Sequence, residues 1–178
     1  MIASIDGFVA DARGEFGWSA PDEEVHAAVN EIERTVGTFL LGRRMYEVLA
    51  TWDTLGLDGE PDVMHDFAGI WRAADKIVYS RTLDEVGGSR TTVEHEFDVE
   101  AVRSLKAASQ RDLSIGGPAL AGRALTAGLV DECDLFLAPV AVGGGTAVFP
   151  PGLDLRLELL EQRRFTSGFV GLRYRPAG

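Results

Sequence analysis

The sequence is poor in cysteine, in lysine and in long apolar runs. Cys133 is the only cysteine, so the chain can form neither an intrachain disulfide nor a cysteine-based metal cluster. The histidines show no metal-ligand spacing, and no metal site is expected. No apolar run approaches the ~20 residues of a membrane-spanning helix, and Asp6 comes too early for a signal-peptide apolar region. These absences predict a cytoplasmic protein with no membrane partner.

Positive charge is scarce as well. The formal net charge is −11, and Lys76 and Lys106 are the only lysines. Nucleic acids and anionic membranes are held mainly by dense Lys/Arg patches, so no nucleic-acid partner is expected. An anionic small ligand would need a local cluster of positive charge. The candidates are the Arg43-Arg44 pair and the isolated Arg81.

The composition is that of an ordinary globular protein, with 46% hydrophobic and 25% charged residues. The length predicts a single domain over residues 1–178. Short apolar runs alternate with helical patterns, which is typical of an α/β sheet with crossover helices. Predicted strands are Ile2–Ile5, Thr38–Leu41, Lys76–Tyr79, Thr91–Glu94, Leu113–Ile115, Leu135–Ala138, Leu155–Glu161 and Gly168–Tyr174. Predicted helices are Asp22–Thr35, Arg43–Leu49, Asp62–Trp71, Val99–Ala108 and Pro118–Ala127.

The last two predicted strands have no helix between them, which predicts an antiparallel hairpin that turns near 165–168. The sheet should therefore be mixed, parallel in its body and antiparallel at its C-terminal edge.

Two junctions between a strand and a helix carry glycine. At Gly42-Arg43-Arg44, glycine would let a phosphate approach the helix start, and arginine matches phosphate oxygens. At Gly116-Gly117, two glycines precede a helix that begins with proline. Ordinary strand-to-helix turns explain either junction alone, but two of them in one small domain favour a dinucleotide.

Other segments are open to a structural and a functional interpretation. Ser80-Arg81-Thr82 could clasp an adenosine 2′-phosphate or be a solvated strand end. Asp6 could cap a turn or contact the substrate, and Trp18 could anchor a loop or bind a heterocycle. Glu23 is either a helix-start residue or a proton relay. The glycine-rich stretch 139–150 predicts a flexible loop.

The order of the motifs along the chain is more specific than any one of them. They are Ser4-Ile-Asp-Gly-Phe-Val-Ala10, Leu40-Leu-Gly-Arg-Arg-Met-Tyr-Glu47, Lys76-Ile-Val-Tyr-Ser-Arg-Thr-Leu83, Ile115-Gly-Gly-Pro-Ala-Leu-Ala121, Gly128-Leu-Val-Asp-Glu132, Pro139 to Phe149 and Phe165-Thr-Ser-Gly168. Over almost the whole chain this order resembles the dihydrofolate-reductase-like family that includes the reductase domain of the bifunctional riboflavin-biosynthesis deaminase/reductase.

The resemblance implies a three-layer α/β/α fold, NADPH across the C-terminal ends of the strands, and a homodimer. By position, Gly42, Arg43 and Arg44 resemble the segment at the cofactor phosphates, and Ser80, Arg81 and Thr82 the segment beside the adenosine 2′-phosphate. The segment Gly116, Gly117, Leu120 and Ala121 matches the pyrophosphate-binding turn.

On the substrate side, the resemblance implies that Asp6 is the acid near the substrate. Gly144-Gly145-Thr146 resembles the Gly-Asp-Thr loop of dihydrofolate reductase, with Gly145 in place of the aspartate. The segment from Trp18 resembles that enzyme's Trp-x-x-Pro-x-Asp, but here Glu23 occupies the register of the acid and Asp22 comes one residue early.

These implications predict an NADPH-dependent reductase of a small heterocyclic or ribosylamino substrate, similar to 5-amino-6-(5-phosphoribosylamino)uracil reductase of riboflavin biosynthesis. A dihydrofolate or pterin reductase is the alternative enzyme, and a non-catalytic NADP-binding dimeric module is the alternative of another class. Asp6, Glu23 or water would supply the proton. Burial would raise either carboxyl pKa, but the helix start opposes this at Glu23, which favours Asp6.

Overall fold

The computed structural model describes residues 1–177 and contains two compact units. The central unit is His26–Ala121, and the terminal unit is Met1–Val25 together with the chain from Gly122 onward. Helix α1 (Glu23–Glu33) and helix α5 (Pro118–Thr126) cross the two boundaries in the sequence. Each unit has its own four-stranded sheet, and a further two-stranded sheet belongs to the terminal unit.

The sheet of the central unit is wholly parallel, in the order β5-β4-β3-β6. Its strands are β3 (Val36–Gly42), β4 (Asp75–Tyr79), β5 (Thr91–Glu94) and β6 (Asp112–Gly116). The connecting helices are α2 (Arg43–Leu49), the 3-10 helix η2 (Ala50–Asp53), α3 (Asp62–Ala73) and α4 (Val99–Ala108). Parallel neighbours require such crossovers, because the chain must return to the same end of the sheet before each new strand.

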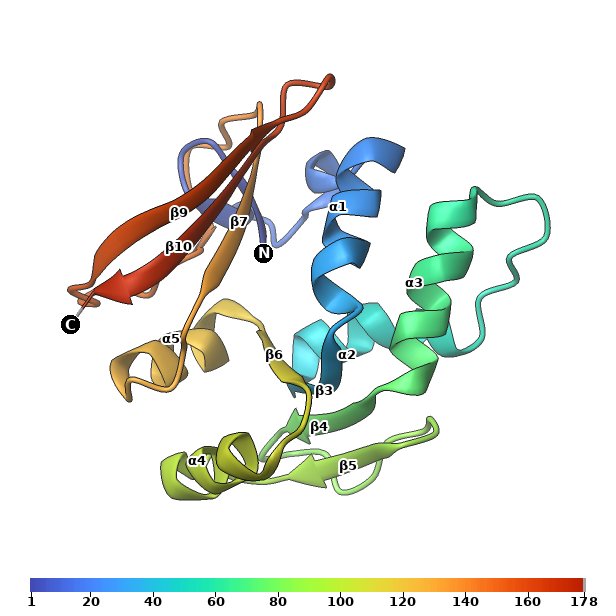
Figure 1. Ribbon diagram of the computed structural model, residues 1–178, viewed down its shortest axis with the longest axis vertical. Helices are drawn as coiled ribbons and strands as arrows, with labels where there is room; N and C mark the ends of the chain where they lie inside the picture. The colour runs from blue at the N-terminus through green and yellow to red at the C-terminus, as the bar shows by residue number, and fades with distance from the viewer. Residues whose placement is uncertain (178) are drawn as a thin grey trace. The chain divides into compact units, whose positions relative to one another are not determined.

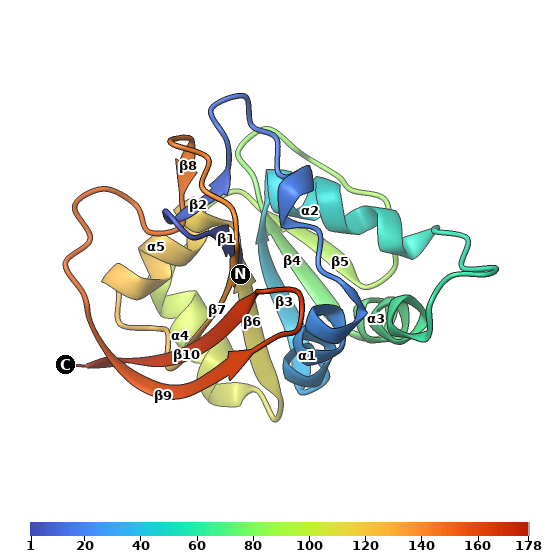
Figure 2. The same cartoon turned by 90° about the horizontal axis from the view of Figure 1, so that it is seen from above.

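Helices pack on both faces of this sheet. Leu41 of β3 and Val78 of β4 belong to one buried cluster with Trp71 of α3. The next residue of β4, Tyr79, points to the opposite face, where its ring meets Phe97, just before α4, at a centroid distance of 5.2 Å. Helices α3 and α4 therefore cover opposite faces, and Figure 2 shows them on the two sides of β3 and β4.

The terminal unit contains a mixed sheet in the order β1-β7-β10-β9. Strand β1 is parallel to β7, whereas β10 is antiparallel to both β7 and β9. The bounds are β1 (Ile2–Ser4), β7 (Cys133–Ala138), β9 (Arg156–Arg164) and β10 (Val170–Ala177). Figure 1 shows β9 and β10 as one long hairpin. The hairpin closes where the Phe165 N–H donates to the Phe169 carbonyl at 3.0 Å.

Much of this organisation agrees with the prediction from sequence. The α/β class, the parallel body and the antiparallel C-terminal hairpin are confirmed, but the parallel body and the hairpin lie in separate sheets and not in the one mixed sheet that was predicted. Helices α2 and α4 and strand β5 have the predicted bounds. Two very short strands, β2 (Phe8–Ala10) and β8 (Thr146–Ala147), and the 3-10 helix η1 (Gly17–Ser19) were not predicted, because segments of two or three residues show no periodicity.

Candidate functional site

Three candidate cofactor segments lie side by side at one edge of the central sheet. The register pairs Gly42 of β3 with Tyr79 of β4, and Leu41 of β3 with Gly116 of β6. Because these strands are parallel and end level, the residues that follow them share the same edge. Those segments are Gly42–Arg44, Ser80–Thr82 and Gly116–Gly117.

The three glycines of this edge differ in backbone conformation and in the space that is available for a Cβ atom. Gly117 has φ +96°, a left-handed conformation that disfavours any side chain. A Cβ on Gly116 would lie 3.0 Å from Leu41 Cδ2 and 3.1 Å from Met45 Cγ, so packing restricts that position. Gly42 has φ −70°, and a Cβ there would meet nothing within 4 Å. Neither the backbone conformation nor packing therefore requires glycine at position 42, the N-cap of α2, and an approaching ligand would be such a requirement.

Arg43 and the end of β4 support one another. The Arg43 guanidinium donates from Nε to Glu47 Oε1 at 2.7 Å and from Nη1 to Thr82 Oγ1 at 2.9 Å. Ser80 is only 7% exposed, and its hydroxyl oxygen accepts the N–H groups of Thr82 and Leu83 at 3.3 and 3.1 Å. These contacts fix the shape of the segment, so Arg43 and Ser80 are already occupied within the protein.

Arg44 and Arg81 differ from Arg43 in this respect. Both are exposed, and neither guanidinium has a hydrogen-bond or ion-pair partner anywhere in residues 1–177. In a chain of net charge −11, two uncompensated arginines near adjacent strand ends create local positive charge. Planar guanidinium groups bind phosphate oxygens in bidentate fashion. This edge can therefore bind a phosphorylated ligand.

Leu120 and Ala121 contribute differently from what their motif suggests. Both side chains are buried, in the first turns of α5. The Ala121 N–H donates to the Gly117 carbonyl at 2.9 Å, whereas the N–H groups of Ala119 and Leu120 have no acceptor within the helix. Only the backbone of this turn is suited to contact a ligand.

In the terminal unit, Asp6 fastens the glycine-rich loop. Its Oδ1 accepts the Val142 N–H at 3.1 Å, and its Oδ2 accepts the Gly143 N–H at 2.7 Å. The hydroxyl of Ser4, which is fully buried, adds a third hydrogen bond to the carboxylate and also accepts the Phe8 N–H at 2.9 Å. This role of Ser4 was not predicted, although the Ser-x-Asp spacing indicates that the two side chains can meet.

The prediction that burial raises the pKa of Asp6 is wrong. Asp6 is exposed, and the hydrogen bonds from the Ser4 hydroxyl and the Gly143 N–H, together with that from Val142, lower its pKa below the ordinary value against the opposing effect of desolvation. Donors stabilise the ionised form of a carboxyl group. Asp6 is therefore an anion at neutral pH, with both carboxylate oxygens engaged.

Gly144 and Gly145, the two glycines that are candidates for substrate contact, follow Val142 and Gly143, the residues that Asp6 binds. Gly145 has φ +135°, and a Cβ there would lie 2.1 Å from the Ala10 carbonyl oxygen, because β8 pairs closely with β2. Gly144 has φ +158°, and a Cβ there would meet nothing within 4 Å. Chain packing alone thus requires glycine at 145, and Gly144 is the position with open space.

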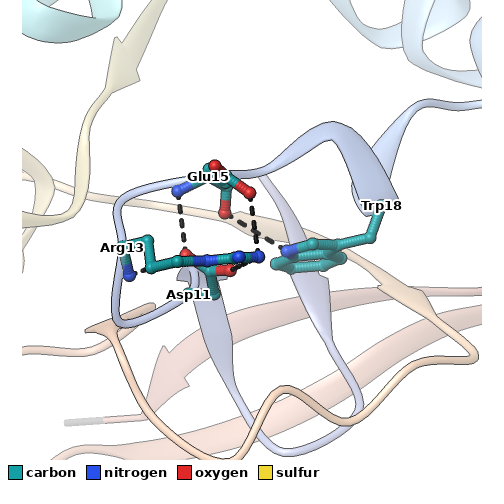
Figure 3. Close-up of polar contacts among 4 residues, drawn as sticks. All are labelled: Asp11, Arg13, Glu15 and Trp18. Atoms are coloured by element: carbon teal, nitrogen blue, oxygen red, sulfur yellow. Dashed lines mark hydrogen bonds and ion pairs between the residues drawn. The ribbon is translucent and has the colours of Figure 1, made fainter.

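Trp18 lies in η1 and is tied to a small polar loop, shown in Figure 3. Its indole N–H donates to the Glu15 carbonyl at 3.2 Å. Asp11 Oδ1 accepts the N–H groups of Arg13 and Glu15, and the Arg13 guanidinium pairs with both acidic side chains. The polar atom of Trp18 is therefore used in anchoring the loop, as the structural interpretation of this residue predicted.

Glu23 and Asp22 divide the roles that the motif near Trp18 suggests. Asp22 caps α1, since its Oδ1 accepts the Val25 N–H at 2.9 Å. A hydrogen bond from the Ser167 side chain, together with the one from Val25, lowers the pKa of Asp22. Glu23 is the first helical residue, is exposed, and has no side-chain partner among the residues that the structure describes. Of the two carboxylates, only Glu23 is free to meet a ligand.

Within residues 1–177 there is no cluster of three or more metal-ligating side chains and no helix long and apolar enough to cross a membrane.

Comparison with known proteins gives consistent matches. Residues 1–170 match the family model of the RibD C-terminal domain. The uncharacterized protein YyaP of Bacillus subtilis (strain 168) is 26% identical over 179 residues, which cover 98% of this chain and 91% of YyaP.

Solved structures share the fold at low identity. A Shewanella sp. PV-4 protein named for riboflavin biosynthesis superposes with a TM-score of 0.78 and 20% identity, over 100% of this chain and 97% of that one. A pyrimidine reductase-like protein of Corynebacterium diphtheriae gives 0.70 and 14%, over 99% and 90%. The Thermotoga maritima diaminohydroxyphosphoribosylaminopyrimidine deaminase/5-amino-6-(5-phosphoribosylamino)uracil reductase gives 0.68 and 17%, over 99% of this chain and 55% of that longer one.

Proposed function

Because the chain belongs to the RibD C-terminal domain family, we propose that it is an NADPH-dependent reductase that transfers a hydride to a small heterocyclic or ribosylamino substrate. The observation that carries this proposal is the edge of the central sheet, where the ends of β3, β4 and β6 gather two glycine junctions and two unpaired arginines. A dinucleotide with a 2′-phosphate needs such a set, since it presents several phosphates along an extended molecule.

The residues of this edge fit NADPH. Gly42 leaves open space beside the start of α2, into which a phosphate oxygen could come. Arg44 and Arg81 are the free cations for the phosphates, and Arg43 is held by its hydrogen bonds to Glu47 and Thr82. The backbone N–H groups of Ala119 and Leu120 would serve the pyrophosphate.

When bound, NADPH would supply a hydride to the carbon of a C=N or C=O bond. The chain would bind and orient the reactants. Asp6 would hold the glycine-rich loop in place, in keeping with its hydrogen bonds to Val142 and Gly143. The proton for the substrate heteroatom would come from water, because Asp6 is ionised and engaged and Glu23 is exposed at a helix start. Trp18, Glu23 and Gly144 remain candidates for contact with the substrate.

The substrate we propose is 5-amino-6-(5-phosphoribosylamino)uracil, the compound in the name of the Thermotoga relative. Dihydrofolate is the second candidate, favoured by the segment from Trp18 to Glu23 and by Gly144-Gly145-Thr146, both of which resemble dihydrofolate reductase only in part. Steady oxidation of NADPH with one of the two compounds would identify the enzyme. Tight NADPH binding without turnover on any heterocycle would instead indicate a non-catalytic module.

The cofactor is tested separately by binding. We expect Arg81→Ala to raise the NADPH dissociation constant about tenfold or more, since a charge-assisted hydrogen bond is lost, and to leave NADH binding nearly unchanged. Arg103→Ala removes an exposed arginine of α4 in the same unit and is the matched control. Equal weakening of NADPH and NADH by Arg81→Ala would show that this arginine does not contact the 2′-phosphate.

We also propose that the protein is a homodimer. Strand β9 is at an edge of its sheet, with Leu159 48% and Leu160 37% exposed. Strand β9 of a second copy could pair with it in antiparallel fashion, so that Glu158 of one copy lies opposite Arg163 of the other. The two-fold symmetry would then form this ion pair twice. Light scattering should give about twice 19.2 kDa, and Leu159→Lys should lower it. Particles of 19.2 kDa alone in the wild type would contradict the dimer.

A further inference from the structure

A buried polar network contacts loop 83–90, the segment that follows Ser80–Thr82. Lys76 of β4, Trp71 of α3 and Asp53 of η2 are linked in it by hydrogen bonds, and Tyr46 of α2 lies within the electrostatic influence of Asp53. Tyr46 is 5% and Lys76 1% exposed, and buried polar groups of this kind are costly unless they are hydrogen-bonded. Neither the proposed cofactor contacts nor the strand pairing of the sheet accounts for this network.

Each member of the network has a defined partner. Lys76 Nζ donates to the carbonyl oxygens of Trp71 and Ala74, both at 3.1 Å, and lies 5.0 Å from the centroid of the Trp71 ring. The Trp71 indole N–H donates to Asp53 Oδ1 at 3.1 Å. Burial lowers the pKa of Lys76, and the negative charge of Asp53 opposes that shift. Lys76 is thus the nearby cation for Asp53, whose carboxylate forms no ion pair within residues 1–177.

The network ends on the loop 83–90. The Tyr46 hydroxyl donates to the Gly87 carbonyl oxygen. Gly88 has φ +120°, and a Cβ there would lie 3.0 Å from Asp53 Oδ2 and 3.2 Å from the Tyr46 hydroxyl. The loop therefore rests directly on both polar groups, and only glycine fits without a shift. Leu83 and Val86 add apolar contacts with the buried cluster under the same loop.

This loop is continuous with the segment proposed to hold the adenosine phosphate. Arg81 has no partner of its own in the described chain, so the backbone on either side must set its position. On the N-terminal side that backbone is β4, and on the C-terminal side it is the loop that Tyr46 and Asp53 hold. If the loop is held in place, the backbone of Arg81 is held in place as well. A bidentate contact between the guanidinium and a phosphate depends on that position.

We propose that Tyr46 is a positioning residue that, through its hydrogen bond to Gly87 and together with Asp53, holds loop 83–90 so that Arg81 can distinguish NADPH from NADH. The inference rests on the proposed function. It assigns cofactor preference in part to a buried tyrosine that touches no ligand, and it explains why Lys76, Asp53 and Trp71 are bonded together beneath a surface loop.

The test uses Tyr46→Phe, which removes only the hydroxyl, and Gly88→Ala, which displaces the loop while the hydroxyl stays. Dissociation constants for NADPH and NADH are measured by fluorescence titration, and hydrogen exchange of residues 83–90 by mass spectrometry. Tyr174→Phe, in β10 of the terminal unit, is the matched control. We expect both test variants to exchange faster in the loop and to bind NADPH about fivefold more weakly, the effect of one hydrogen bond, with NADH within about twofold.

The outcomes separate the inference from the proposed function. If the wild type prefers NADPH and both variants keep the same ratio of the two constants, Tyr46 has no positioning role and the proposed function stands. An equal loss for NADPH and NADH would indicate a general effect on folding and would also overturn the inference. If the wild type does not prefer NADPH, the proposed function fails and the inference fails with it.

Discussion

Replacing Gly42 with alanine separates a ligand requirement from a folding requirement. Gly42 has φ −70°, which alanine adopts readily, and its Cβ would meet nothing within 4 Å. Alanine restricts the unfolded chain, which stabilises the fold, but is a poorer residue than glycine at the N-cap of α2. These small effects oppose each other, so the free energy of unfolding should change by less than about 1 kcal/mol.

Ligand binding should respond very differently. If a phosphate oxygen accepts hydrogen bonds at this junction, the new methyl group occupies the space it needs. The loss of one charge-assisted hydrogen bond weakens binding by roughly tenfold or more. We therefore expect Gly42→Ala to unfold at the wild-type urea midpoint and to bind NADPH at least about tenfold more weakly.

The assay pairs urea unfolding with NADPH titration, and the control is Gly69→Ala. Gly69 lies in α3 of the same unit, and a Cβ there also meets nothing within 4 Å. In a helix interior that change should stabilise by about 0.5–1 kcal/mol and leave the cofactor affinity unaltered. Unchanged NADPH affinity in Gly42→Ala would refute the reasoning, because no phosphate oxygen would then need the space beside Gly42.

Three further predictions concern the rest of the chain. Asp6→Asn should slow single-turnover hydride transfer but leave the shape of its pH profile unchanged between pH 5 and 9, since the lowered pKa keeps the carboxylate ionised throughout that range. Burial lowers the pKa of His26 from its ordinary value of 6.5, and the negative charge of Asp66 opposes this shift. As the pH falls, His26 is therefore protonated in the unfolded chain before it is protonated in the folded protein. The wild type should therefore lose stability relative to His26→Phe as the pH falls below 6.5 in urea titrations, and parallel curves would contradict this assignment. Gly122→Ala should destabilise by about 1–3 kcal/mol in thermal unfolding, because its Cβ would lie 2.4 Å from Pro150 Cγ, and an unaltered midpoint would show that Pro150 yields freely.

The elements that could be predicted from sequence are those whose signal is local. Helix α4 has an apolar periodicity and a capping residue, Asp98, which accepts the N–H groups of Glu100 and Ala101, and its predicted bounds are correct. Strand β9 was predicted to start one residue early and to end at Glu161, whereas it continues to Arg164. Its exposed, highly charged C-terminal end has no alternation, and pairing with β10 holds it in the strand.

Individual side-chain roles were harder to predict. Arg43 and Arg44 are adjacent and chemically identical, yet Arg43 is bonded to Glu47 and Thr82 while Arg44 is free. Helix geometry decides this, since position 47 lies one turn beyond position 43 on the same face. Tyr46 is part of the quoted motif, but its bond to Gly87 crosses 41 residues of sequence and no local pattern indicates it.

The cofactor candidates and the substrate candidates lie in different units. All the cofactor candidates lie in the central unit, on segments that each follow directly from one parallel strand, so strand register alone brings them together. The substrate candidates lie in the terminal unit on separate loops, and their arrangement depends on distant contacts such as that between Asp6 and Gly143, which are 137 residues apart. A family can therefore change its substrate by changing these loops without disturbing the strand ends. On this view, changes at Asp6 or Gly144 should alter substrate kinetics and leave the dissociation constant of NADPH untouched.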